Sequence, residues 1–292
     1  MSALPRTARR ARVRPFRLAS SLGFETIVGA SVLALFVVVA LAAPPLAPYD
    51  PHAFSGQPLE RPSAAHPLGT NDAGQDILSE LIYGARISLV VGLGAALGTV
   101  ALGLLVGGVA GYAGGTLDVL LMRLVDVMLT LPRLPLLILL AAFLGSGLVQ
   151  TTLIISLLFW PATARVIRAE VQRQRTRGYV KMARNFGASV GYILRRHILP
   201  AVAPLIAFGL IAAASQAVAM EAGLAFLGLG DPTAKSWGLI MRFALDLPGL
   251  LLTDRWLWWL LPPGLCITLL ILALTYVGMG LEQRLHPGLA RR

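Results

Sequence analysis

Charged residues are scarce in this sequence. Only 13% of its 292 residues are charged, whereas 56% are hydrophobic. Soluble domains carry about 25% charged residues, so this scarcity excludes an ordinary soluble domain. Several apolar runs reach or approach the roughly 20 residues that a helix needs to cross a bilayer. Together these features predict an all-α integral membrane protein.

Cysteine and lysine are also rare, and their positions exclude several kinds of site. The single cysteine, Cys266, lies in an apolar run, so neither a disulfide nor a thiolate metal site can form within the chain. Neither lysine, Lys181 nor Lys235, follows a glycine, as a phosphate-binding loop requires. No catalytic Ser/His/Asp spacing stands out. We therefore expect a non-catalytic chain that holds no cofactor and no metal itself.

One loop brings a histidine and two carboxylates close together in the sequence. His66, Asp72 and Asp76 could serve as metal ligands. Their spacing matches no known metal site, and aspartate is favoured at the start of a helix. We therefore favour solvated-loop and helix-capping roles, with a turn at 72–76 that leads into a short helix.

The formal net charge is +11, but its distribution does not indicate a nucleic-acid partner. The sequence has no nucleic-acid-binding motif and no basic module interleaved with aromatic residues. Instead, segments 1–25, 165–200 and 281–292 hold six, nine and three basic residues. Such residues concentrate on the cytoplasmic side of membrane proteins. We therefore predict a cytoplasmic N-terminal tail, internal loop and C-terminal tail, with both termini inside.

Six apolar stretches are predicted to be transmembrane helices. They cover residues 26–46, 87–110, 118–144, 149–164, 201–220 and 257–280. The first is longer than the core of a cleaved signal peptide, which has about 7–15 residues, and it ends in prolines, so we expect it to be retained. The loop at 47–85 is then extracytoplasmic, and 86–280 form a five-helix core. Pro132 and Pro135 predict a kink in the third span.

Small and charged residues within the spans predict helix contacts. Glycines recur four residues apart, which lets a second helix approach closely. They are Gly94 with Gly98 and Gly103 with Gly107. Arg123 and Asp126 lie on one face of their helix. We favour a local ion pair or a snorkelling arginine there over a role in gating.

Three polar residues of the fifth span and its outer end are candidates to line a translocation pathway. Ser215, Gln216 and Glu221 qualify because polar groups in a span tend to face the bundle interior. Hydrogen bonds between helices explain them equally well. No ionisable group is expected near the middle of the bilayer, where a proton-coupled carrier needs one. The energy for transport is therefore expected to come from a partner.

The internal loop has the pattern of two short helices joined by a turn. Apolar residues recur at helical spacing in the first helix, at Tyr179, Met182, Ala183 and Phe186. Gly187 suits the end of that helix, and Ser189 can cap the next one. The second helix is predicted to turn Val190, Ile193, Leu194 and Ile198 inward and Arg195 and Arg196 outward. Pro200 is expected to interrupt the helix before the fifth span.

This loop resembles the E-A-A-x3-G-x9-I-x-L-P loop of ABC importer permeases. Here it reads K-M-A-R-N-F-G, nine residues, and H-I-L-P, with the spacing kept throughout 181–200. Lys181 stands in place of the usual acid, Met182 in place of the first alanine, and His197 in place of an aliphatic residue. Further blocks resemble the "C" permease subunit of the dipeptide/oligopeptide/nickel type. They are APYDP (47–51), HPLGTNDAGQD (66–76), YGARISL (83–89), GYAGGTLD (111–118), MRLVDVMLTLP (122–132), EAGLAFLGLG (221–230) and SWG (236–238).

The resemblance implies a type I ABC importer permease fold in the bacterial inner membrane. It implies a complex embedded in a lipid bilayer, in which this chain forms a heterodimer with a homologous second permease. In such a complex, two cytoplasmic ABC ATPases bind ATP and Mg, and an extracytoplasmic solute-binding protein delivers the solute. Peptides are the expected solute, and nickel or another small solute is the alternative. The alternative from a different functional class is a channel or secondary carrier that works without ATPases. Residues expected to couple to the ATPases are Val180, Lys181, Met182, Ala183, Arg184, Asn185, Phe186, Gly187, Ala188 and Ser189.

Overall fold

The computed structural model describes residues 23–285, and every regular element in this part of the chain is a helix. Five of the described helices are long and apolar enough to cross a membrane, or up to six if one bent pair counts as a span. The prediction of an all-α membrane protein with about six spans is therefore confirmed. Most of the basic N-terminal tail (1–22) and the end of the C-terminal tail (286–292) lie outside the described residues. The cytoplasmic placement of both termini stays a prediction.

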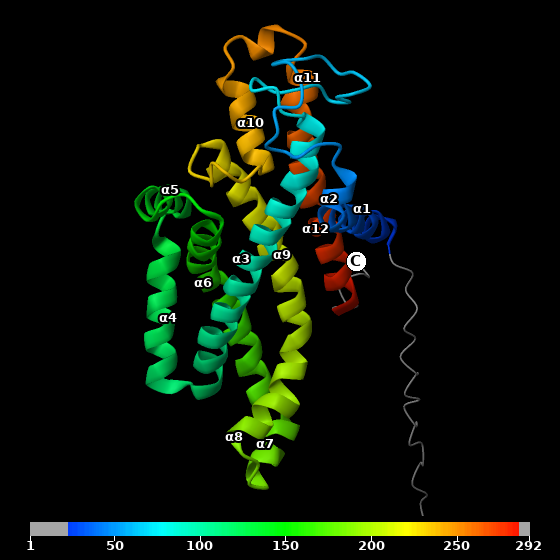
Figure 1. Cartoon of the computed structure of the whole chain (residues 1–292). Coiled ribbons are helices and arrows are strands. Elements are labelled where there is room, and N and C mark those ends of the chain that lie inside the picture. Colours follow the sequence, from blue (N-terminus) through cyan, green and yellow to red (C-terminus); the bar gives the residue numbers. More distant parts are fainter. Residues whose placement is uncertain (1–22, 286–292) are drawn as a thin grey trace, which may run out of the picture.

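The helices form one elongated bundle (Figure 1). The longer helices are α1 (Phe24–Leu41), α3 (Ile77–Ala113), α4 (Gly115–Thr130), α5 (Arg133–Leu144), α6 (Leu148–Arg175), α9 (Leu199–Phe226) and α12 (Leu261–Leu285). The shorter elements are α2 (Ala43–Leu46), α7 (Gly178–Asn185), α8 (Val190–Ile193), the π-helical turn η1 (Leu194–Ile198), α10 (Trp237–Asp246), the 3₁₀ turn η2 (Leu250–Leu252) and α11 (Trp256–Trp259). Residues 47–76 and the segment around α11 gather at one end of the bundle, and α7 and α8 lie at the other (Figure 1). We call residues 47–76 and 227–260 the cap.

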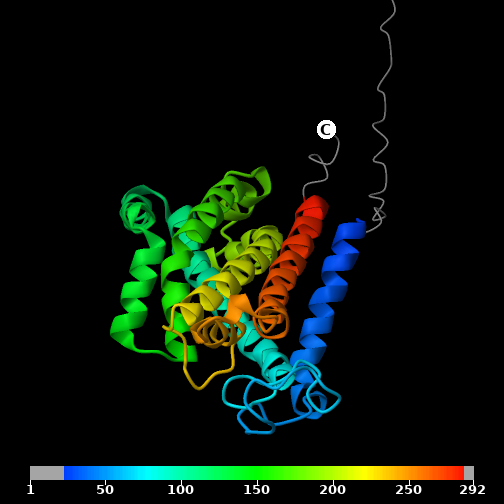
Figure 2. The same cartoon turned by 90° about the horizontal axis from the view of Figure 1, so that it is seen from above.

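Helix α3 lies at the centre of the bundle and packs against α6, α9 and α1 (Figure 2). Its glycines let α6 approach. A Cβ atom at Gly103 would lie 2.7 Å from Thr163 Cγ2, and one at Gly107 would collide with the carbonyl of Ala164. The predicted close helix approach is confirmed, and α6 is the helix that makes it.

Helix α3 begins ten residues before the predicted span at 87–110. Asp76 caps it, because Asp76 Oδ2 accepts a hydrogen bond from the Ser79 amide at 2.8 Å. The first turns carry polar side chains, Glu80 among them, that do not resemble a membrane span. Hydrophobicity therefore located the membrane part of the helix but missed its polar beginning.

The predicted third span at 118–144 is two helices. Helices α4 and α5 meet at an angle of 88°, so the chain turns sharply where only a kink was expected. Leu131 is extended, with φ −72° and ψ 136°, as the residue before a proline prefers. Pro132 then stands just before α5, where its missing N–H removes no helical hydrogen bond.

The other long helices also differ in length from their predicted spans. Helix α6 continues to Arg175, eleven residues past the predicted end at 164, and α9 continues to Phe226 rather than ending at 220. The predicted spans at 26–46 and 257–280 each have a break near the cap, which separates α1 from α2 and α11 from α12. Helical hydrogen bonding continues into polar turns, which a search for apolar runs leaves out.

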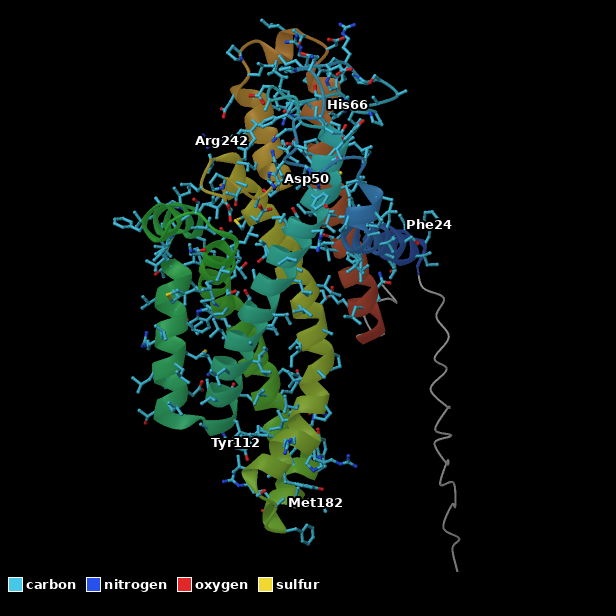
Figure 3. The ribbon with its side chains drawn as sticks, in the orientation of Figure 1. Phe24, Asp50, His66, Tyr112, Met182 and Arg242 are labelled. Atoms are coloured by element: carbon cyan, nitrogen blue, oxygen red, sulfur yellow. The ribbon has the colours of Figure 1, made fainter. Side chains whose placement is uncertain are left out.

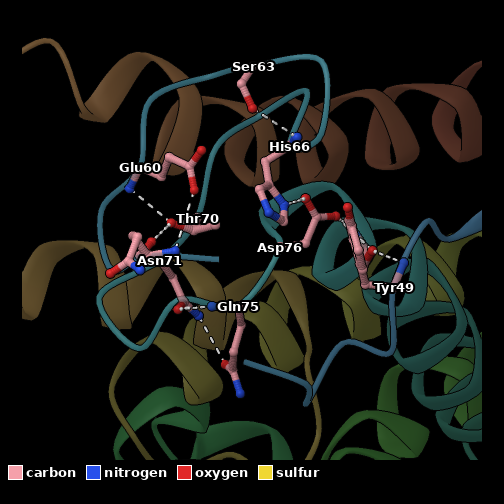
Figure 4. A network of polar contacts seen from close by, with 10 residues as sticks. Tyr49, Glu60, Ser63, His66, Thr70, Asn71, Gln75 and Asp76 are labelled. Atoms are coloured by element: carbon pink, nitrogen blue, oxygen red, sulfur yellow. Dashed lines mark hydrogen bonds and ion pairs between the residues drawn. The ribbon is translucent and has the colours of Figure 1, made fainter. Parts of the chain in front are cut away.

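Polar contacts around Asp76 hold the cap together (Figure 4). His66 Nδ1 lies 3.0 Å from Asp76 Oδ1, and the Ser79 hydroxyl donates to Asp76 Oδ2 at 2.7 Å. Asp72 is exposed. In the described part of the chain, no cluster of three or more His, Cys, Asp or Glu side chains could hold a metal ion. The helix-capping interpretation is confirmed for Asp76. The solvated-loop interpretation is wrong for His66, which is buried.

A buried ion pair fastens the cap to α3. Lys235 Nζ donates to Glu80 Oε1 at 2.7 Å and to Gln75 Oε1 at 2.6 Å. The Glu80 side chain is only 2% exposed, and Asn71 Nδ2 donates to the same oxygen at 3.0 Å. Two residues after Lys235, the Trp237 indole donates to the Leu81 carbonyl at 2.9 Å. The segment before α10 is thereby fixed to the first turns of α3.

Candidate functional site

The segment predicted to couple to the ATPases begins as the short helix α7 and ends in a defined turn. Gly187 has a φ of +83°, the left-handed conformation that glycine adopts most readily. The Gly187 amide donates to the Arg184 carbonyl and the Ala188 amide to the Ala183 carbonyl, both at 3.0 Å. These two bonds form a Schellman motif, which closes a helix C-terminus. The predicted helix end at Gly187 is confirmed.

The turn leads directly into α8. The Ser189 side chain accepts a hydrogen bond from the Tyr192 amide at 3.3 Å, so the predicted cap is present. Ile193 and Ile198 are buried as expected, whereas Val190 is exposed and Leu194 is half-buried. Pro200 does not interrupt the helix. The turn η1 continues into α9, and Pro200 occupies the first turn of α9, where a proline is tolerated.

Residues 187–191 also read G-A-S-V-G, which fits the G-x-S-x-G pattern of serine hydrolases. In those enzymes the serine stands on a sharp turn between a strand and a helix. Here Ser189 lies between two helices and its hydroxyl caps the second of them. The pattern marks a helix cap in this chain and gives no support for a nucleophile.

Helix α7 has one buried side and one exposed side. Val180 is 3% exposed and packs in a cluster with Ile167 and Val171 of α6 and Ile198 of η1. On the other side Phe186 is 85% exposed and Met182 is 59% exposed. Met182 lies at the end of the molecule opposite to His66 of the cap (Figure 3). An apolar surface is thus presented outward on a helix that is held firmly against the bundle.

The remaining residues of the segment surround this surface. Lys181, Arg184 and Asn185 are exposed, and Ala183 and Ala188 are half-buried. In the described part of the chain, no carboxylate forms an ion pair with Lys181 or Arg184. The segment therefore offers two cations around exposed apolar side chains, a composition that suits a protein partner better than water.

A groove of about 180 Å³ lies between α3, α6 and α9 and contains one of the three predicted pathway residues. Gln216 of α9 lines it, together with two residues that sequence reasoning missed, Thr99 of α3 and Thr163 of α6. Each is a polar residue within an apolar stretch, and this pattern was the signal by which the sequence could have predicted them. The other lining residues are mainly apolar, so three uncharged polar side chains share one narrow space.

The other two predicted pathway residues lie elsewhere. Glu221 is buried, and its Oε2 accepts a hydrogen bond from Ser88 Oγ of α3 at 3.5 Å. Ser215 is half-buried and does not line the groove. For Glu221 the alternative of a bond between helices fits the structure, and the structure brings only Gln216 to the groove.

Two ion pairs join α4 to α6 on the side of α7. Arg168 of α6 binds Asp118 of α4, and Arg165 binds Asp126 at 2.6 Å. Arg123 is exposed and is not the partner of Asp126. The predicted local pair between Arg123 and Asp126 is therefore replaced by a pair between two helices.

Comparison with known proteins identifies relatives over most of the chain. Residues 103–291 match the family described as "Binding-protein-dependent transport system inner membrane component". The chain is 38% identical to the di/tripeptide transport system permease protein DppC of Pseudomonas aeruginosa, over 89% of this chain and 87% of that protein. It is 35% identical to the dipeptide transport system permease protein DppC of Bacillus subtilis, over 91% of this chain and 82% of that protein. The DppC of Haemophilus influenzae is likewise 35% identical, over 90% of each chain.

These matches agree with the resemblance that the loop at 181–200 and the other blocks indicated, and they confirm it. The family match covers more than half of the chain, and the relatives are similar to it over most of their length, so the family of this chain is established. The chain is a multi-pass membrane permease subunit and belongs to the family of binding-protein-dependent transport system inner membrane components.

Proposed function

We propose that this chain forms half of the translocation pathway of an ABC importer for di- or oligopeptides. The relatives from Pseudomonas aeruginosa, Bacillus subtilis and Haemophilus influenzae are named for di/tripeptides or dipeptides, and none of the three is named for nickel. The family description names a binding protein, which supports delivery of the solute by an extracytoplasmic solute-binding protein. The site of action is the bacterial inner membrane.

The proposed complex contains a homologous second permease, which forms a heterodimer with this chain, and two cytoplasmic ABC ATPase subunits. ATP and Mg²⁺ are bound by the ATPases. The support is the absence of a phosphate-binding loop from the sequence, because neither lysine follows a glycine. In this proposal the chain itself is a non-catalytic transport subunit.

The observation that carries the proposal is the exposed apolar side of α7. Phe186 (85% exposed) and Met182 (59% exposed) lie four residues apart and form an apolar patch on a cationic segment outside the predicted spans, and such patches mark interaction sites. Buried aromatic anchors contribute much of the binding energy in protein interfaces. We assign residues 180–189 as the surface that docks on an ATPase subunit, with Phe186 and Met182 as its apolar contacts.

The packing of α7 explains how such a contact would move the spans. Val180 packs on α6 and near η1, and η1 continues into α9. Closure of the ATPases on ATP would displace α7, and this cluster would pass the displacement to α6 and α9. Transport then requires that the solute contact the inward-facing and outward-facing states differently.

The groove at Gln216 is proposed as this chain's part of the pathway. Its amide and the hydroxyls of Thr99 and Thr163 are uncharged groups that can both donate and accept hydrogen bonds. Such groups can bind the main-chain amides that all peptides share, so they would permit the transport of peptides with many different sequences. Glu221 and Ser215 are assigned to helix packing instead.

The test uses the complete complex in proteoliposomes, with ATP-driven uptake of a labelled dipeptide as the readout. Phe186→Ala should abolish most of the uptake and reduce retention of the ATPases, while the amount of inserted chain stays normal. Phe24→Ala is the matched control, because Phe24 is also a largely exposed phenylalanine (81%) but lies at the start of α1, away from α7. Normal uptake by Phe186→Ala would contradict the coupling role.

Two further measurements test the remaining parts of the proposal. Uptake of Ni²⁺ but not of dipeptides would contradict the proposed solute. Uptake by this chain without ATPases would support the channel or carrier alternative instead.

A further inference from the structure

A second, larger groove lies between α1, α3, α9 and α12. Its volume is about 490 Å³, and almost all of its lining is apolar. Helix α3 contributes Val90 and Leu93, α1 contributes Val37, and α9 contributes Val218. Val90 and Leu93 are themselves more than half exposed, so the groove opens to the outside of the described chain.

Arg86 is the one charged residue that lines this groove. It lies four residues before Val90 and seven before Leu93, so the three share one face of α3. Arg86 is exposed, and no carboxylate in residues 23–285 forms an ion pair with it. A guanidinium thus stands at one end of an apolar groove without a counterion from the described chain.

The position of Arg86 along α3 gives the groove a direction. Arg86 directly precedes the predicted span at 87–110, on the side of the cap. Leu93 lies about 10 Å further along the helix, because each residue rises about 1.5 Å. Leu41, the last residue of α1, lines the same groove and also lies toward the cap. The charge therefore stands at the membrane boundary, and the apolar part extends inward from it.

This groove is separate from the candidate pathway. Val218 lines it, whereas Gln216 lines the groove between α3, α6 and α9. Residues two apart in a helix do not share a face. The two grooves therefore open on different sides of α9, and a peptide in the pathway would not fill this one.

We infer that this groove binds an anionic phospholipid from the leaflet on the cap side. One acyl chain lies along Val90 and Leu93, and the phosphate contacts Arg86. The charge decides between this occupant and an apolar helix of the second permease. Such a helix would cover the apolar lining but supply no anion for the exposed arginine, whereas a phosphate headgroup at the membrane boundary attracts it.

The test is native mass spectrometry of the complete complex, which is extracted from vesicles that contain equal amounts of phosphatidylglycerol and phosphatidylcholine. Wild-type complex should retain phosphatidylglycerol in preference to phosphatidylcholine. Arg86→Gln should lower the retained phosphatidylglycerol about fivefold, the effect of one basic residue at an anionic surface. Arg86→Lys keeps the charge and should restore most of it. Arg123→Gln is the matched control, because Arg123 is an exposed arginine of α4, away from the groove.

A second measurement keeps the inference falsifiable if Arg86→Gln fails to assemble. A photo-crosslinking residue at Val90 should form its main adduct with phospholipid. Val90→Trp should fill the groove and lower the retained lipid without loss of ATPase subunits. Equal phosphatidylglycerol in Arg86→Gln and wild type, or a main adduct with the second permease, would overturn the assignment.

Discussion

Asp118 of α4 and Arg168 of α6 form a two-point ion pair. Arg168 Nη2 donates to Asp118 Oδ2 at 2.7 Å, and Arg168 Nε donates to Asp118 Oδ1 at 2.5 Å. Gln172 Nε2 adds a third hydrogen bond to this carboxylate at 3.0 Å. Paired bonds of this kind fix the relative geometry of the two groups. Since α6 leads to α7, the pair ties α4 to the part of the bundle that would move with the coupling segment.

Asp118→Asn should therefore destabilise the complex. The change removes the counterion of a largely buried arginine and weakens charge-assisted bonds, which contribute about 1.5–3 kcal/mol each. Asp246→Asn is the control, because the Arg242–Asp246 pair of α10 is exposed and lies outside the predicted spans, so it should contribute less than about 1 kcal/mol. Thermal unfolding of the purified complex measures both. Equal decreases in the unfolding temperature of the two variants would show that the Asp118–Arg168 pair stabilises the complex no more than the exposed pair does.

Gly187→Val should reduce ATP-driven uptake. No atom lies within 4 Å of a Cβ built at Gly187, so the cost comes from its positive φ rather than from a collision. A left-handed residue other than glycine costs about 1–2 kcal/mol, and a β-branched one is disfavoured further. The variant should rearrange the turn between α7 and α8 while the spans insert normally.

Two variants control for the Gly187 experiment. Gly191→Val places the same side chain in α8, where the site is equally open but φ is not positive, and it should keep most uptake. Gly187→Asn should be intermediate, because asparagine tolerates the left-handed conformation better than valine. If Gly187→Val and Gly191→Val behaved alike, backbone conformation would not be the cause.

Gln216→Leu should lower dipeptide uptake without loss of assembly. It removes one side chain that can donate and accept hydrogen bonds from the groove between α3, α6 and α9, which is the proposed pathway. One such bond contributes about 1 kcal/mol, so the expected loss in kcat/KM is about fivefold. Ser215→Ala changes the neighbouring polar residue, which does not line the groove, and should leave uptake unchanged. A larger loss from Ser215→Ala would place the pathway on another face of α9.

Lys235→Met should strongly destabilise the cap. It leaves the Glu80 carboxylate, which is 2% exposed, without its cation, and breaking a buried pair in this way costs about 3–5 kcal/mol. The double variant Lys235→Met with Glu80→Gln removes the charge as well and should recover much of the loss. Limited proteolysis of residues 47–76 reports the stability of the cap. A double variant no more resistant than the single one would contradict this explanation.

The sequence predicted best what depends on local rules. The helix end at Gly187 and the cap at Ser189 follow from backbone conformation and from one amide hydrogen bond, both of which are set within a few residues. The glycine positions of α3 predicted a close helix contact, although the identity of α6 as the partner could not be read from them. The family resemblance rested on spaced motifs, which need no three-dimensional information.

Contacts between distant residues were beyond that reasoning. Asp126 pairs with Arg165 rather than with the nearby Arg123, because the packing of α4 on α6 decides which arginine is within reach. The right-angle turn at Leu131–Pro132 was underestimated, since a proline limits local conformation but does not fix the direction of the next helix. Thr99 and Thr163 joined the groove only through the folding of three helices together.

The length of α3 has a mechanical consequence. Its 37 residues span about 55 Å, whereas the hydrocarbon core of a bilayer is about 30 Å thick. One uninterrupted helix therefore joins the cap, through Glu80 and Lys235, to the α6 contact at Gly103 and Gly107. A tilt imposed on this helix at one side of the membrane must displace its far end. A single rigid helix thus links the orientation of the cap to that of the opposite end of the bundle.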